Sequence, residues 1–110
     1  NFNKRLNNNK EIQYKLIALF IEETPKQLDQ LAQCIAQNDS VQQHEISHKL
    51  QGMSANLNAQ ELLNMTKEFN QLLKEPSANQ TKVEQLFDAM KLSYQNLEKE
   101  LTAALAEQVS

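Results

Sequence analysis

Residues 81–104 read TKVEQLFDAMKLSYQNLEKELTAA, and this stretch decides the fold class. Its apolar side chains recur in alternating steps of four and three residues: Val83, Phe87, Met90, Tyr94, Leu97, Leu101 and Ala104. This heptad-like spacing gathers them on one side of a single long α-helix. Such a seam fits one wall of an antiparallel helical bundle, and it also fits a coiled-coil dimer.

The same spacing recurs in three earlier segments, whose apolar stripes are Ile12, Leu16, Leu19, Phe20, Leu28, Leu31, Ala32 and Ile35; Ile46, Leu50, Met53 and Leu57; and Leu62, Met65, Phe69, Leu72 and Leu73. The first segment contains Thr24-Pro25, a typical helix start, so it is one long helix kinked there or two abutting helices. Capping patterns predict helix starts at Ser40, Asn58 and Thr81. Pro76 ends the segment that follows Asn58.

The composition supports an all-helical chain. Its 110 residues include one glycine and two prolines, far fewer turn-forming residues than a sheet protein needs. Short connections make neighbouring helices antiparallel. We therefore expect an all-α, antiparallel up-down four-helix bundle with a short extra N-terminal helix in residues 1–8. Residues 1–110 are expected to form a single domain.

The charge pattern and the apolar runs exclude several classes of partner. The net charge is −3 and basic residues are scattered, which argues against nucleic acid binding. The longest apolar run, residues 16–21, is far shorter than the about 20 residues that a membrane span needs. The single cysteine, Cys34, suits a reducing compartment and reads as a core or boundary residue. We expect a cytoplasmic, monomeric domain that makes no membrane contact itself.

One helix carries a residue pattern that packing does not explain. His48 lies about opposite the stripe of that helix, so it should face solvent. The only glycine, Gly52, follows one turn later in mid-helix, where glycine costs about 1 kcal/mol relative to alanine. Gly52 and Ala55 leave the imidazole open to a partner. The alternative is an ordinary surface histidine beside a tolerated glycine.

An open imidazole suits phosphoryl transfer. The ring is largely uncharged at neutral pH, so a nitrogen lone pair can attack phosphorus without the help of a base. Phosphoryl transfer otherwise needs positioning and charge neutralisation, and a partner can supply both.

Residues 47–57, SHKLQGMSANL, resemble the signature of histidine-containing phosphotransfer (HPt) domains, which runs roughly A-H-x-L-K-G-x-S-x-x-L-G. Residues 20–25 are similar to the helix that precedes that signature. The resemblance implies that His48 accepts a phosphoryl group from an aspartate of one receiver domain and passes it to another receiver. It also implies that the receiver supplies Mg²⁺, that this domain binds no cofactor, and that Gly52 gives access to the histidine. Such a phosphocarrier is not an enzyme on its own.

Two positions depart from that signature. Gln51 replaces the usual lysine, and glutamine donates hydrogen bonds without a charge. Asn58 replaces a glycine, a mild change because asparagine tolerates left-handed backbone geometry. The Gln51 change leaves open a degenerate HPt-like or coiled-coil adaptor that docks a partner without phosphotransfer. The predicted receiver-docking surface comprises His44, Glu45, Lys49, Gln51, Gly52 and Ala55.

The stretch His44-Glu45-Ile46-Ser47-His48 also matches the H-E-x-x-H pattern of zinc proteases, with Glu68 as a candidate third ligand. We disfavour this function and expect no metal site, because a slim bundle offers no substrate cleft. The first residue is Asn and not Met, and a helix begins early, so we expect the chain to be a C-terminal fragment of a larger hybrid sensor kinase, with the bacterial inner membrane as that protein's anchor. A free-standing carrier is the alternative.

Overall fold

The computed structural model describes the backbone of residues 2–75 and 79–109 and the side chains of residues 10–75 and 79–107. These residues form four helices: α1 (Phe2–Ala36), α2 (Ser40–Asn56), α3 (Gln60–Leu73) and α4 (Gln80–Val109). None of the described residues forms a strand. The all-helical class predicted from the composition is confirmed.

The short extra N-terminal helix is not seen as a separate element. α1 runs without a break from Phe2, and Pro25 lies inside it; residue 1 lies outside the described part of the chain. No glycine or proline precedes Pro25, so nothing in this stretch forces the helix to end. Of the two possibilities left open by Thr24-Pro25, the structure has the single helix.

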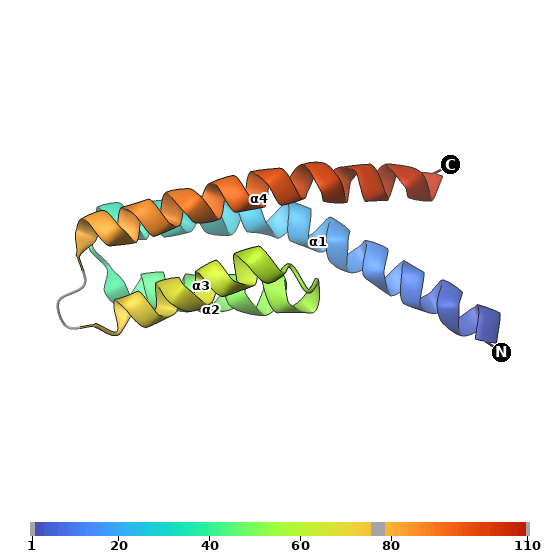
Figure 1. The fold of residues 1–110 in the computed structure, drawn as a ribbon, viewed down its shortest axis with the longest axis horizontal. Coiled ribbons are helices and arrows are strands. Elements are labelled where there is room, and N and C mark those ends of the chain that lie inside the picture. The colour runs from blue at the N-terminus through green and yellow to red at the C-terminus, as the bar shows by residue number, and fades with distance from the viewer. Residues whose placement is uncertain (1, 76–78, 110) are drawn as a thin grey trace.

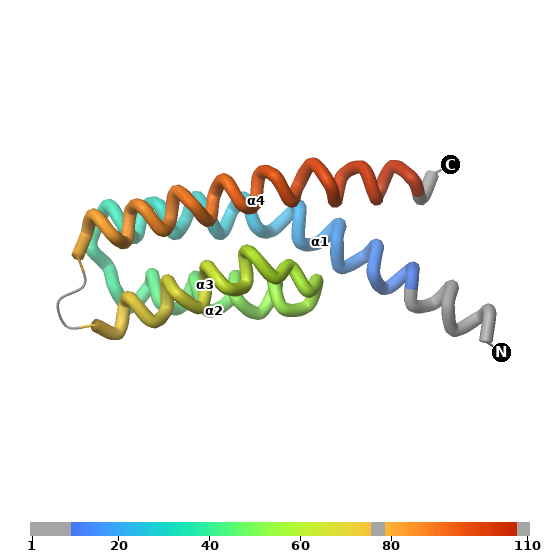
Figure 2. The backbone as a smooth tube through the Cα atoms, viewed as in Figure 1, coloured from blue at the N-terminus to red at the C-terminus, as the bar shows by residue number. Residues whose placement is uncertain are grey.

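Figures 1 and 2 show how the helices are arranged. The chain reverses direction at each connection, and α1 and α3 each pack against both α2 and α4. The longer helices, α1 and α4, extend together past the shorter pair α2 and α3, and both chain ends lie at that extended end. Within the described part of the chain, α2 packs against α1 and α3 only, and its outer face is not covered by another helix.

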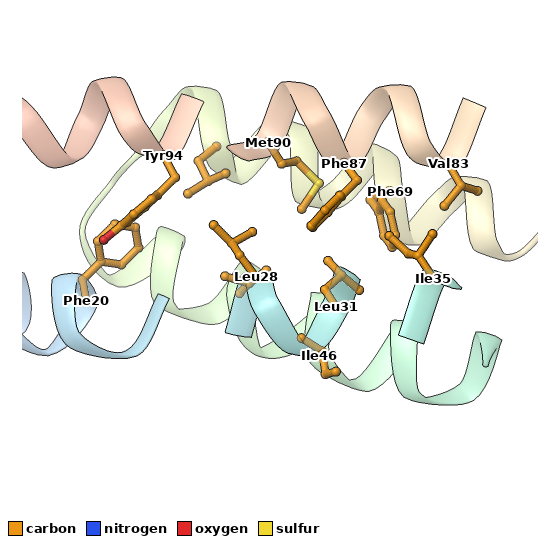
Figure 3. Close-up of a cluster of buried hydrophobic side chains, with 12 residues drawn as sticks. Phe20, Leu28, Leu31, Ile35, Ile46, Phe69, Val83, Phe87, Met90 and Tyr94 are labelled. Atoms are coloured by element: carbon orange, nitrogen blue, oxygen red, sulfur yellow. The ribbon is translucent and has the colours of Figure 1, made fainter. Parts of the chain in front are cut away.

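The core draws on all four helices (Figure 3). It contains Phe20, Leu28, Leu31, Ile35, Ile46, Leu50, Leu62, Phe69, Val83, Phe87, Met90 and Tyr94. The first four members of the predicted α4 seam are buried within one chain, and Leu97 and Leu101 pack against the core. This packing favours the bundle wall over the coiled-coil dimer as the reason for the seam. Cys34 is partly buried against the core, as predicted.

The predicted caps are each shifted: α2 and α3 are preceded by Asp39 and Ala59, one residue from Ser40 and Asn58. α2 is capped by Asp39, whose Oδ1 accepts a hydrogen bond from the Gln42 main-chain N–H over 3.1 Å. α4 begins at Gln80, and the Thr81 main-chain N–H donates to Asn79 Oδ1 over 2.8 Å, so Thr81 is not its cap.

Asn58 is not the N-cap of α3. It follows the C-terminus of α2 with φ 55°, the left-handed geometry that favours glycine or asparagine after a helix. This φ value explains why asparagine is acceptable where the HPt signature has glycine.

Candidate functional site

His48 lies on the outer face of α2. Its neighbours along the helix alternate in the way a half-buried helix requires: Ile46, Ser47 and Leu50 are buried, whereas His48 and Lys49 are exposed. The outward orientation predicted for His48 is therefore present. Since no other helix covers this face, the imidazole is accessible to a second molecule.

A second histidine accompanies it. His44 lies one turn earlier on α2, and its ring stacks with the His48 ring at a centroid separation of 6.3 Å and an interplanar angle of 26°. Both side chains are exposed. Glu45, next to His44 in the sequence, is exposed as well.

Gly52 leaves open space on the same side of α2. Apart from its two chain neighbours and the helix's own backbone, a methyl group at this position would meet no heavy atom within 4 Å, and the φ angle of Gly52 is not positive. Neither packing nor backbone geometry within the bundle therefore requires glycine. Ala55, the next small residue along, is exposed as well. A partner could approach the α2 backbone closely at these two positions.

Gln51 differs from the other predicted site residues because it is half-buried and has a partner within the chain. Its Oε1 accepts a hydrogen bond from Nδ2 of Asn70, on α3, over 2.9 Å. Asn70 is only 7% exposed. Sequence reasoning missed Asn70; the available signal was a polar residue directly after Phe69, in the apolar stripe of its helix.

Sequence reasoning also missed a groove at the start of α2. It lies between α2 and the end of α3 and is lined by Ser40, Val41, His44, Glu45, Leu73 and Lys74. Val41 is 67% exposed, an uncommon position for a β-branched apolar side chain. The groove adds apolar surface to the polar face that carries the two histidines.

The residues of the zinc alternative do not come together. Glu68, the candidate third ligand, lines a groove between α3 and α4 with Lys82 and Leu86, whereas His44 and His48 lie on the outer face of α2. Over the described residues, no three His, Cys, Asp or Glu side chains are grouped so that they could hold a metal ion. In the part of the chain that the structure describes, the geometry thus provides a histidine pair and no third ligand.

The fold and site define a helical bundle that presents His48, beside His44, on the open face of one helix. Residues 15–107 match the family model described as Hpt domain. Because this match spans most of the chain, the protein belongs to the Hpt domain family, whose members carry phosphoryl groups in phosphorelays and interact there with receiver domains. Hpt domains are phosphocarriers and not catalysts.

No curated protein and no solved structure gave a significant match to the chain. Among the helices of the described residues, none is both long and apolar enough to cross a membrane.

Proposed function

We propose that this domain is a phosphocarrier that holds the phosphoryl group on His48. The observation that carries the proposal is the exposed His48 ring on an uncovered face of α2, with open space at Gly52 one turn further on. A receiver domain must bring its aspartyl phosphate to within bonding distance of the ring. The empty position at residue 52 gives it room to do so.

In the transfer itself, the bond to phosphorus is made by the His48 ring. A lone pair on one imidazole nitrogen attacks the phosphorus of the receiver's aspartyl phosphate. The N–P bond forms as the P–O bond breaks, and the aspartate keeps the bonding electrons as a carboxylate. In the onward step, an aspartate of a second receiver attacks the same phosphorus and the imidazole leaves with its nitrogen lone pair. Mg²⁺ held by the receiver would neutralise charge on the phosphoryl oxygens.

The receiver would bind the outer face of α2. His44, Glu45, Lys49 and Ala55 are exposed there around His48, and the groove beside Val41 supplies an apolar edge. Polar and apolar surface side by side is typical of a transient protein interface. We further propose that the domain acts as a monomer in the cytoplasm, within a hybrid sensor kinase or alone.

The test is transfer of labelled phosphate from a phosphorylated receiver domain to the wild-type chain, to His48→Gln and to His44→Gln. We expect the wild type and His44→Gln to take up label that is labile in acid and stable in alkali, as a phosphohistidine is. His48→Gln should take up none. Equal labelling of His48→Gln would reject His48 as the acceptor.

A docking-only domain is the second candidate, and the uncharged Gln51 is the observation that favours it. Under this alternative, receivers bind the α2 face but transfer nothing. Binding measured by calorimetry, together with no label in the wild type from any receiver tried, would support docking alone. Transfer to the wild type would exclude it.

A further inference from the structure

Asn70 is a polar side chain on the buried side of α3. Its neighbour Phe69 is fully buried, and Asn70 itself is 7% exposed. The Asn70 Oδ1 atom is buried and has no hydrogen-bond partner among the described residues. A half-satisfied amide in this environment destabilises a fold relative to an apolar side chain of similar size. A residue that is unfavourable for stability often marks a functional position.

The hydrogen bond that the Asn70 side chain donates to Gln51 controls the orientation of the Gln51 amide. A glutamine amide ends in an acceptor oxygen and an NH₂ donor, and rotation can present either to a neighbour. Here the Asn70 Nδ2 atom donates to the Gln51 Oε1 atom over 2.9 Å. With its oxygen held toward α3, Gln51 keeps both N–H groups of its Nε2 atom for other partners.

Gln51 follows His48 by three residues, so the two side chains are neighbours on the surface of α2. A phosphoryl group on His48 would present acceptor oxygens that carry negative charge. The NH₂ end of Gln51 would stabilise those oxygens, whereas its carbonyl end would repel them.

We infer that Asn70 is a positioning residue for phosphoryl transfer: by binding the Gln51 oxygen, it presents the Gln51 NH₂ group to the phosphoryl group on His48. This inference rests on the proposed function of His48. Asn70 itself does not touch the phosphoryl group and acts only through Gln51. An uncharged side chain, oriented in this way, can still stabilise the phosphoryl oxygens.

The test uses phosphoramidate, a small donor whose P–N bond breaks with loss of ammonia as His48 takes the phosphoryl group. No receiver is then needed, so docking does not affect the rate. The second-order rate of phosphorylation is compared for the wild type, Asn70→Leu, Gln51→Ala and the double variant. Asn64→Leu is the matched control, because Asn64 is an exposed asparagine of α3. Thermal unfolding is measured for each protein.

We expect Asn70→Leu to unfold at the wild-type temperature or above it, yet to be phosphorylated about three- to tenfold more slowly, the effect of losing one aligned hydrogen bond. Gln51→Ala should be equally slow, and adding Asn70→Leu to it should change nothing more. Asn64→Leu should match the wild type. An unchanged phosphorylation rate in Asn70→Leu would overturn the inference. So would an equal slowing by Asn70→Leu in the wild-type protein and in Gln51→Ala.

A spectroscopic measurement separates this inference from the proposed function. In the unphosphorylated protein, NMR should show contact between the Asn70 side-chain amide protons and Gln51, with exchange protection that disappears in Gln51→Ala. Absence of that contact would overturn the positioning role even if His48 accepts phosphate. If the contact is present but wild-type His48 takes up no phosphate, the proposed function fails and the positioning role fails with it.

Discussion

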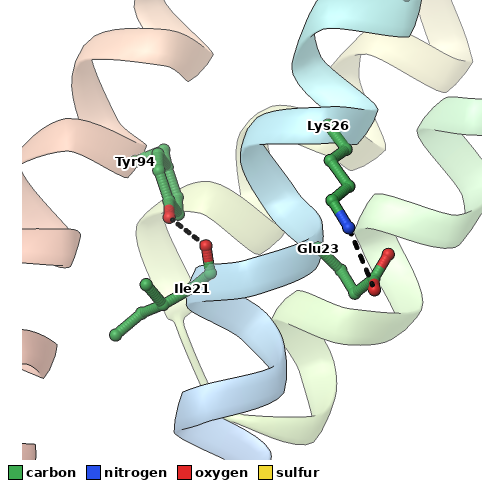
Figure 4. A network of polar contacts seen from close by, with 4 residues as sticks. All are labelled: Ile21, Glu23, Lys26 and Tyr94. Carbon is green, nitrogen blue, oxygen red and sulfur yellow. Dashed lines mark hydrogen bonds and ion pairs between the residues drawn. The ribbon is translucent and has the colours of Figure 1, made fainter.

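The Tyr94 hydroxyl donates a hydrogen bond to the main-chain carbonyl oxygen of Ile21 over 3.3 Å and so links α4 to α1 (Figure 4). The Tyr94 ring also packs at a tilt against Phe20, with 5.6 Å between the ring centroids. Burial, with a smaller effect of Glu98, raises the pKa of Tyr94 to about 12. The bond therefore depends on a neutral phenol, and the fold keeps the phenol neutral well above the usual pKa.

This pKa shift predicts a loss of stability in alkali. In the unfolded chain, tyrosine ionises near pH 10, whereas folded Tyr94 keeps its proton to about pH 12. The stabilising contribution is complete below pH 10 and is lost as the pH rises from about 10 to about 12. Tyr94→Phe should lack this decline and should be about 1 kcal/mol less stable at pH 7, because the hydrogen bond to Ile21 is gone.

Urea unfolding of the wild type and of Tyr94→Phe at several pH values from 7 to 11 measures the difference. All other ionisable groups are common to the two proteins, so the difference isolates Tyr94. A constant difference across the range would contradict the predicted shift.

A second prediction concerns Leu50, the core residue on the face of α2 opposite His48. Leu50 is completely buried and lies two residues after His48 on the opposite face of α2. Leu50→Ala should reduce the free energy of unfolding by about 2–5 kcal/mol, the range for a large buried side chain. Leu92 is 59% exposed, so Leu92→Ala should change stability by less than about 0.5 kcal/mol. Chemical denaturation measures the free energy of unfolding of both variants. Similar losses of stability in the two would contradict the burial of Leu50 in the core.

A third prediction separates folding from function at Gly52. Since a methyl group there meets no neighbouring atom within 4 Å, Gly52→Ala should raise the free energy of unfolding by about 0.5–1 kcal/mol through helix propensity. Gly52→Gln should also fold, but its longer side chain should obstruct a receiver. We expect Gly52→Gln to lose most transfer from a phospho-receiver while retaining phosphorylation by phosphoramidate. Equal loss with both donors would contradict an access role for Gly52.

The helical class and the core stripes could be predicted because period and composition are local properties of the sequence. Ile12 and Leu19 show the limit: both belong to the predicted stripe of α1, yet they are 56% and 50% exposed. α2 and α3 are much shorter than α1 and α4. Past the end of the shorter pair, fewer helices cover the N-terminal part of α1, and a periodic pattern within α1 does not reveal this. Leu19 has a different reason: Ile17 and Phe20 on either side of it are only 5% and 1% exposed, so α1 is covered there and Leu19 points away from the core.

The site divides in the same way. The outward face of His48 and the gap at Gly52 follow from rotation along one helix, so the sequence predicts them. The bond between Asn70 and Gln51 joins residues 19 positions apart and depends on how α3 is aligned against α2. The groove between Val41 and Leu73 depends on the same alignment. Periodicity within one helix carries no information about that alignment.

A fourth prediction concerns charge at Gln51. Gln51→Lys would place an ammonium group near His48, and a hydrogen bond from a charged donor is worth about 1.5–3 kcal/mol against about 1 kcal/mol for a neutral one. We expect phosphorylation from a receiver to become up to about tenfold faster. Lysine has no acceptor for Asn70, so the same variant should lose about 1 kcal/mol of stability.

The matched control is Gln42→Lys, which adds the same charge at an exposed position of α2. Stopped-flow phosphotransfer and urea unfolding would measure both effects. Equal acceleration in Gln42→Lys would mean that net charge steers the receiver and that position 51 has no special role. Acceleration confined to Gln51→Lys would mean that the native glutamine gives slower transfer than lysine would, while it stabilises the contact between α2 and α3.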